Sequence, residues 1–155
     1  MLAHTGTAGS TRSHPDPVAG PLEPIRRRVA MAALGGGALD LAFWLLYAAG
    51  ALTIAREGPA ASFESAFPVA DTLLGVTLVG AGIALHRRSA AGPFFLVAAA
   101  SMALYLGLLD LTFYLRHDLY DLPAWTGLAA LGLNLVCIGG GAAGLWYGWR
   151  LWRAR

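Results

Sequence analysis

Three aspartates lie within apolar stretches that are long enough to cross a bilayer. Asp40, Asp71 and Asp110 each occupy a different stretch, and Asn134 occupies a fourth. A carboxylate at the bilayer centre costs roughly 2.5–3.5 kcal/mol on insertion scales. Side chains that are retained there pair with other polar groups, bind ions or substrates, or transfer protons. These four residues are therefore the first candidates for chemistry.

Two of the aspartates share a local motif. Residues 37–47 and 107–117 are identical at six of eleven positions, which indicates either a duplicated two-helix hairpin or chance similarity between leucine-rich segments. In both copies, rings follow the aspartate at i+3, i+4 and i+7 and share its helix face. These rings belong to Phe43, Trp44 and Tyr47 in the first copy and to Phe113, Tyr114 and His117 in the second. The pattern predicts an acidic, aromatic-lined cavity that suits a cation.

Asp71 and Asp110 also have structural explanations. Asp71 follows Pro68 by about one turn, so its charge complements the N-terminal end of a helix. Asp110 could pair with His117 or Arg116, although Arg116 lies on a different helix face. We favour a structural role for Asp71 and a functional one for Asp110.

Asp40 lies far from both ends of its span, and no arginine lies within reach along the helix. Its structural alternative is an interhelical hydrogen bond, either with a hydroxyl group or with Asn134. A functional and a structural role are equally supported for Asp40. Asn134 is predicted to link helices or, alternatively, to orient a ligand.

The composition is that of a membrane protein. Of 155 residues, 57% are hydrophobic and only 13% are charged, against about 25% charged residues in soluble domains. The apolar segments cover residues 29–55, 66–85, 93–115 and 123–149. They leave no room for a soluble catalytic domain and lack the alternation of a β-barrel. We predict an all-α, four-transmembrane-helix bundle over residues 25–155, after a disordered cytoplasmic tail over residues 1–24.

The arginines predict the orientation of the spans. All eleven basic residues are arginine, which is typical of a GC-rich bacterial coding sequence. Nine lie near the two termini or between the second and third spans, and only Arg56 and Arg116 lie in the other connections. The positive-inside rule then places both termini in the cytoplasm of a bacterium, with the chain in its inner membrane.

Small residues recur at helical spacing in two spans. The fourth span carries Gly140, Gly144 and Gly148, and the second carries Gly80 and Ala84. Small residues four apart let helix backbones approach closely. In the fourth span they predict a helix contact, either inside the bundle or with a second copy or a partner helix.

Motifs of known catalytic and metal sites are missing from the sequence. The single cysteine, Cys137, excludes an intramolecular disulfide and a cysteine-based metal site. The sequence contains no HExxH, CxxC, phosphate-loop or Ser-His-Asp pattern. We predict no metal site, and no cofactor can be assigned.

Short motifs in the first three spans resemble a known group. They are Asp40-Leu-Ala-Phe43, then Phe67-Pro68 with Asp71, then Gly107-Leu108 with Thr112-Phe113-Tyr114. This order is similar to that in the small four-helix bacterial membrane proteins of the YvaD-like group, over most of residues 37–135. The resemblance implies a four-helix membrane fold and carries no established activity. Asp110 departs from the group, where this position is not expected to be acidic.

Three functions are compatible with the sequence. The first is binding of a cationic or amphipathic small molecule, with transport and proton coupling as extensions, at Asp40, Trp44, Tyr47, Asp71, Asp110, Phe113, Tyr114 and Asn134. The second is an intramembrane lipid or isoprenoid isomerase or cyclase, with Asp40 or Asp110 as the general acid. The third is an accessory subunit of a larger membrane complex. We favour the first.

Overall fold

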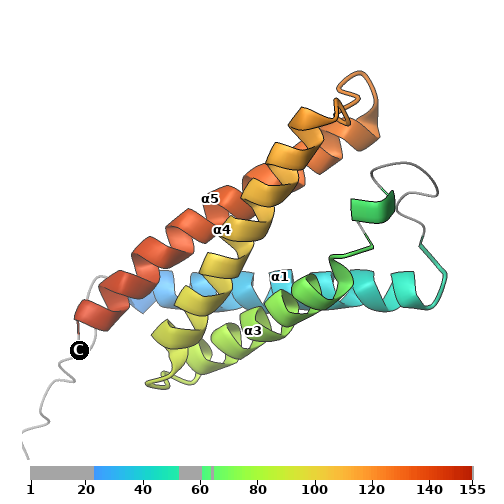
Figure 1. Ribbon diagram of the computed structural model, residues 1–155. Helices are drawn as coiled ribbons and strands as arrows, with labels where there is room; N and C mark the ends of the chain where they lie inside the picture. Colours follow the sequence, from blue (N-terminus) through green and yellow to red (C-terminus); the bar gives the residue numbers. More distant parts are fainter. Residues whose placement is uncertain (1–22, 53–60, 64, 155) are drawn as a thin grey trace, which may run out of the picture.

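The computed structural model describes residues 23–52, 61–63 and 65–154, which contain four long helices and no strand (Figure 1). The helices are α1 (Glu23–Ala48), α3 (Pro68–His86), α4 (Gly92–Arg116) and α5 (Trp125–Arg153). Each is long and apolar enough to cross a membrane. The all-helical prediction with four candidate spans is confirmed.

Both ends of α1 differ from the predicted span. The helix begins at Glu23, whose carboxylate accepts hydrogen bonds from Arg26 (2.8 Å) and Arg88 (2.7 Å). It ends at Ala48, because Gly50 adopts a left-handed φ of +73°, a conformation that commonly terminates helices. The predicted tail lies outside the described residues except for its last two, which belong to α1.

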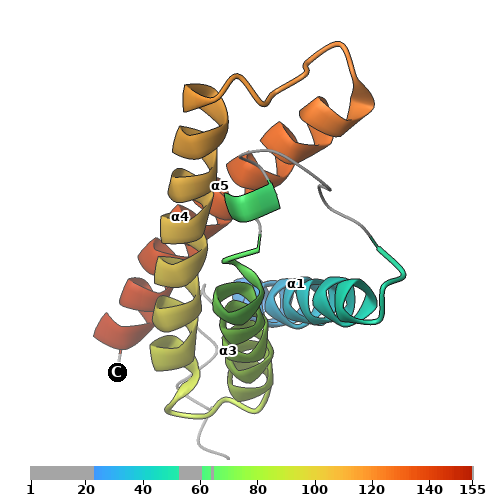
Figure 2. The ribbon, with the colours of Figure 1, turned by 45° about the vertical axis from the view of Figure 1, so that its right-hand side comes forward.

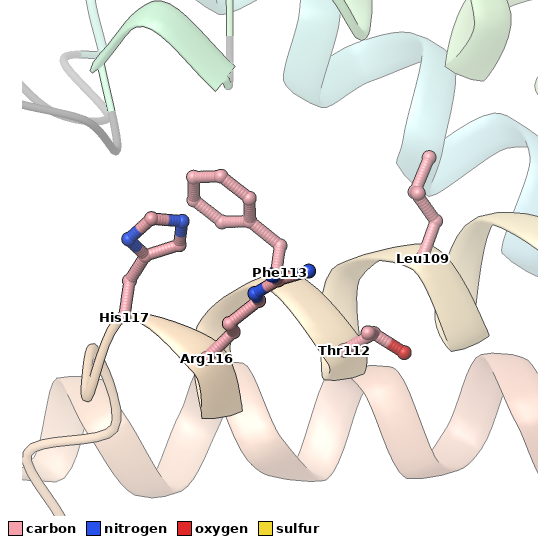
Figure 3. A pocket seen from close by; sticks show the side chains of 5 residues that line it. All are labelled: Leu109, Thr112, Phe113, Arg116 and His117. Carbon is pink, nitrogen blue, oxygen red and sulfur yellow. The ribbon is translucent and has the colours of Figure 1, made fainter.

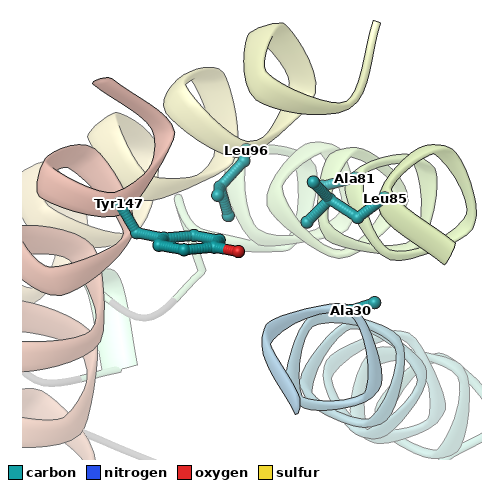
Figure 4. Packing of buried hydrophobic residues seen from close by; sticks show 5 residues of the cluster. All are labelled: Ala30, Ala81, Leu85, Leu96 and Tyr147. Atoms are coloured by element: carbon teal, nitrogen blue, oxygen red, sulfur yellow. The ribbon is translucent and has the colours of Figure 1, made fainter. Parts of the chain in front are cut away.

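The helices pair as two hairpins, α1 with α3 and α4 with α5, and α3 packs on α4 to join them. The hairpins come together at one end and splay apart toward the other (Figures 1 and 2). We call the first the convergent end, where all four helices contribute to one apolar cluster (Figure 4). Its members are Ala30, Ala81, Leu85, Leu96 and Tyr147. We call the opposite end, which carries the α4–α5 connection, the divergent end.

The four helices form an open arrangement, in which the two outer helices of the hairpins have little contact. Among the described helices, α1 and α5 do not pack along their lengths. The reason is the steep crossing of the two hairpins, which keeps the outer helices together only at the convergent end (Figure 2). At the divergent end, each hairpin therefore has helix faces that the other hairpin does not cover.

Small residues set the spacing of α1 and α3. Gly37 packs on Gly75, and Gly82 packs on Ala30, so the two contacts are seven positions apart on each helix. A Cβ atom would lie 2.7 Å from the Gly75 carbonyl oxygen if added to Gly37, and 2.8 Å from the Ala30 carbonyl oxygen if added to Gly82. Since both obstacles are backbone atoms, a larger residue would force the helices apart.

The α4–α5 contact also depends on glycine. Gly141, Gly144 and Gly148 all face α4, and a Cβ on Gly141 would lie 2.8 Å from the Ala100 carbonyl oxygen. Gly140 has no neighbour within 4 Å on the described chain. Two of the three glycines predicted to form a helix contact thus pack within the chain, and Gly140 faces outward.

Four hydroxyl groups inside α3 and α4 are satisfied locally. Thr72, Thr77, Ser101 and Thr112 each donate a hydrogen bond to the carbonyl oxygen four residues earlier. A bilayer core offers no water for such groups, so local bonding lets these partly exposed residues face lipid.

Replacing Gly37 by alanine should destabilise the protein, because the new Cβ meets the backbone of Gly75. We expect a loss of roughly 1–3 kcal/mol, as for other overpacked sites. Gly36→Ala is the matched control, since nothing lies within 4 Å of Gly36. Denaturant unfolding in detergent micelles measures the free energy of unfolding of both variants. Equal values for the two would contradict the close α1–α3 contact.

Alanine substitution of a packed and an unpacked glycine also tests which face of α5 contacts α4. Gly141→Ala should lower the free energy of unfolding by roughly 1–3 kcal/mol, whereas Gly140→Ala should leave it unchanged or raise it, because alanine favours a helix over glycine. The same micellar unfolding assay is used. A larger loss of unfolding free energy for Gly140→Ala than for Gly141→Ala would show that Gly140, and not Gly141, faces α4.

Candidate functional site

Asp40 is the most unusual polar residue of the described chain. Its Oδ2 atom is buried and accepts no hydrogen bond from the described residues. The carboxylate lies against Gly75 of α3, where a Cβ would come within 2.6 Å of Oδ2. The polar groups that face the carboxylate are the Gly75 backbone amide and the Trp44 indole. Buried polar atoms are rarely left without a partner, so Oδ2 is where a proton or a donor group would bind.

All three membrane aspartates lie in one region of the molecule. The carboxylates of Asp110, Asp71 and Asp40 lie within electrostatic range of the Cys137 thiol, and Asp110 acts on it most strongly. These carboxylates come from α4, α3 and α1, and Cys137 comes from α5. Each helix therefore contributes one polar group to this region, which we call the acidic region.

The acidic region lacks the geometry of a metal site. Within the described residues, no three His, Cys, Asp or Glu side chains are placed to hold one ion. Asp71 sits in the first turn of α3, as its structural explanation requires. Asp71 and Asp110 are both half-buried, so the acidic region is defined by charge and burial rather than by a coordination shell.

Asn134 has a structural role in this chain. It is 4% exposed, and its Nδ2 donates a 2.6 Å hydrogen bond to the Tyr120 hydroxyl. The Tyr120 ring in turn packs on Tyr114, with centroids 5.1 Å apart. Asn134 thus ties the α4–α5 connection to α5 and is not bonded to Asp40. Sequence reasoning missed Tyr120, because a residue in a connection shares no helical periodicity with its partner.

The aromatic residues of the two motif copies occupy different surroundings. Trp44 is 7% exposed and packs with Tyr47 in an apolar cluster that includes Phe67 and Leu106. These two rings therefore fill a core instead of lining an open cavity. Only the indole edge of Trp44 reaches the acidic region, through Asp40.

Phe113, in the second copy, lies at the divergent end. Its ring stacks in parallel on Phe63, with centroids 3.7 Å apart, and contacts His117 at 4.4 Å. A pocket of about 420 Å³ adjoins this stack and opens to the outside (Figure 3). It is lined by Leu109, Thr112, Phe113, Arg116 and His117.

This pocket is not the acidic cavity that the sequence predicts. None of the three aspartates lines it, and its ionisable residues are Arg116 and His117. Of the predicted site residues, only Phe113 belongs to it. The acidic region and the pocket are thus separate features with opposite charge.

Sequence reasoning also missed Gly75. The glycine pair selected in the second span was Gly80 with Ala84, whereas Gly80 faces Phe95 of α4. The available signal was the spacing of seven between Gly75 and Gly82. It matches the spacing of Ala30 and Gly37 on the neighbouring helix.

Comparison with known protein families, with curated proteins and with solved structures gives no match. The resemblance to the YvaD-like group therefore stays a prediction.

Tyr120→Phe should destabilise the protein, because it leaves the buried Asn134 amide without its acceptor. We expect a loss of roughly 0.5–1.5 kcal/mol, the range for polar contacts between membrane helices. Tyr105→Phe, at a tyrosine that is 65% exposed, is the control and should be neutral. Micellar unfolding measures both variants, and a neutral Tyr120→Phe would remove the structural role of Asn134.

Proposed function

We propose that this chain is a multi-pass membrane protein that binds a cation or a cationic amphipathic molecule at Asp40. The observation that supports this most directly is the buried, unpartnered Oδ2 atom. An ion pair does not explain the burial of this carboxylate. Glu23 forms ion pairs with Arg26 and Arg88, but these lie at the convergent end.

The surroundings of Asp40 favour a positively charged ligand. Asp71 and Asp110 add negative charge to the same region, and the described arginines lie near helix ends or in connections. A neutral or anionic ligand would gain nothing from these groups.

Binding of a cation at Asp40 Oδ2 would also be coupled to binding of a proton. A proton and a cationic ligand would compete for Oδ2, so occupancy by one disfavours the other. Coupling of this kind is the basis of many carboxylate-dependent membrane carriers. Transport would further require the acidic region to open alternately to each side. The limited contact between the hairpins supports such a movement, because only α3 and α4 join them along their lengths.

We also propose that the protein resides in a bacterial inner membrane with both termini in the cytoplasm. The arginine distribution supports this orientation. The convergent end, which carries the start of α1 and the end of α5, would then face the cytoplasm.

A second candidate function is that of a subunit in a larger membrane assembly. Among the four spans, α5 buries the smallest share of its length. Gly132, Gly139 and Gly140 on this helix have no neighbour within 4 Å on the described chain. Purification in mild detergent, followed by native mass spectrometry, tests this: a stoichiometric partner would support it and a bare monomer would oppose it.

Binding of tetraphenylphosphonium, a lipophilic cation, tests the cation site. The protein in nanodiscs should bind it more weakly as the pH is lowered, because protons compete for the Asp40 carboxylate. Asp40→Asn should reduce the affinity by about 10- to 100-fold, the equivalent of one charge-assisted contact. The pH dependence should also decrease. Isothermal titration calorimetry at a series of pH values measures the affinity of both proteins and its pH dependence.

Asp121→Asn is the matched control, since this exposed carboxylate lies in the α4–α5 connection. It should bind the probe as the unaltered protein does. Equal affinity of the Asp40→Asn variant and the unaltered protein at every pH would rule out Asp40 as the cation site.

A further inference from the structure

The pocket at the divergent end has a chemistry that the proposed cation site does not use. Its residues lie along the last two turns of α4, where Leu109, Phe113 and Arg116 recur at helical spacing. Seven residues separate Leu109 from Arg116, which corresponds to about 10 Å along a helix. The lining therefore combines two apolar side chains and the Thr112 hydroxyl with two basic groups from the end of the helix.

We propose that this pocket binds an anionic phospholipid, with the phosphate at Arg116 and His117 and the start of an acyl chain along Leu109 and Phe113. This site is independent of the cation site at Asp40. The bound phosphate would receive hydrogen bonds from the guanidinium group, whose planar array of N–H donors suits a phosphate.

The charge of Arg116 is available for such a ligand. Among the described residues, no carboxylate forms an ion pair with it, although Asp118 and Asp121 follow in the connection. Arg116 lies in the last turn of α4 and is exposed. The His117 ring is held against Phe113, with one of its two nitrogen atoms on the side of that ring (Figure 3).

The depth of the pocket matches a lipid head group. The residue that begins α5 at this end is Trp125, which is 79% exposed. Tryptophan prefers the level of the head groups at a membrane surface. Arg116 ends α4 at the same end of the hairpin, so its guanidinium lies where phosphates are found.

The size and lining of the pocket select a lipid over other anions. A volume of about 420 Å³ is within the range of small-molecule sites. A free phosphate would contact only the basic end and leave the apolar wall uncovered. A phospholipid covers both parts.

Native mass spectrometry of the full chain tests the proposal. The protein is released from nanodiscs that contain equal amounts of phosphatidylglycerol and phosphatidylcholine, and the retained lipid is counted. We expect retention of one phosphatidylglycerol, about tenfold above phosphatidylcholine, as for one charge-assisted contact. Arg116→Gln should abolish this preference. Arg27→Gln, at an exposed arginine of the convergent end, should preserve it.

Three outcomes would overturn the proposal. They are an unchanged preference in the Arg116→Gln variant, equal retention of the two lipids by the unaltered protein, and displacement of the lipid by millimolar glycerol phosphate. The last result would show a site for a soluble anion. A further variant, Leu109→Gln, should weaken lipid retention, because it makes the apolar wall polar, and retention at the level of the unaltered protein would also count against a lipid site.

Discussion

The close approach of α1 and α3 at Gly37 and Gly75 is the constraint on which the rest of this structure depends. Within a bilayer, helices gain little from burying apolar side chains, because lipid tails are equally apolar. Contact must come from backbone surfaces that fit closely, and two glycines allow this. The missing side chain at position 75 also leaves the space that the Asp40 carboxylate occupies. One packing feature thus holds the first hairpin together and positions its buried charge.

The Asp40 carboxylate differs from the other polar side chains in its hydrogen bonding. Thr77 and Ser101 bond to their own helices, and Asn134 bonds to Tyr120. Glu23 links α1 to the α3–α4 connection through Arg88. Asp40 Oδ2 is the exception among the buried side-chain atoms of the described residues. A fold that satisfies its other buried polar atoms and leaves one carboxylate oxygen unpaired supports a functional role for that oxygen.

The two copies of the local motif share packing but not surroundings. Gly37 packs on α3 and Gly107 packs on α5 beside Cys137, so each glycine contacts the partner helix of its own hairpin. The rings that follow differ, since Trp44 fills a core and Phe113 borders the basic pocket. The shared residues therefore explain how each hairpin closes. They do not create two equivalent ligand sites.

The sequence by itself determined the four helices and their approximate bounds. A bilayer core requires every backbone group to be bonded internally, so a long apolar segment has few alternatives to a helix. It also identified Asp40, Asp71 and Asp110 as unusual, because the cost of a charge in lipid depends on depth more than on contacts. The end of α1 at Gly50 was readable in principle, as a glycine that stops a helix.

Only the tertiary structure decided how each helix is rotated and what each side chain meets. A helix with small residues on several faces can turn any of them toward a neighbour. Gly141 packs inside the chain and Gly140 faces out for this reason. The partner of Asn134 comes from a connection, and the pocket at the divergent end is basic because α4 ends in Arg116 and His117 beyond the level of the aspartates. The bond between Asn134 and Tyr120 depends on how the connection folds back onto α5, and no periodicity in the sequence relates these two residues.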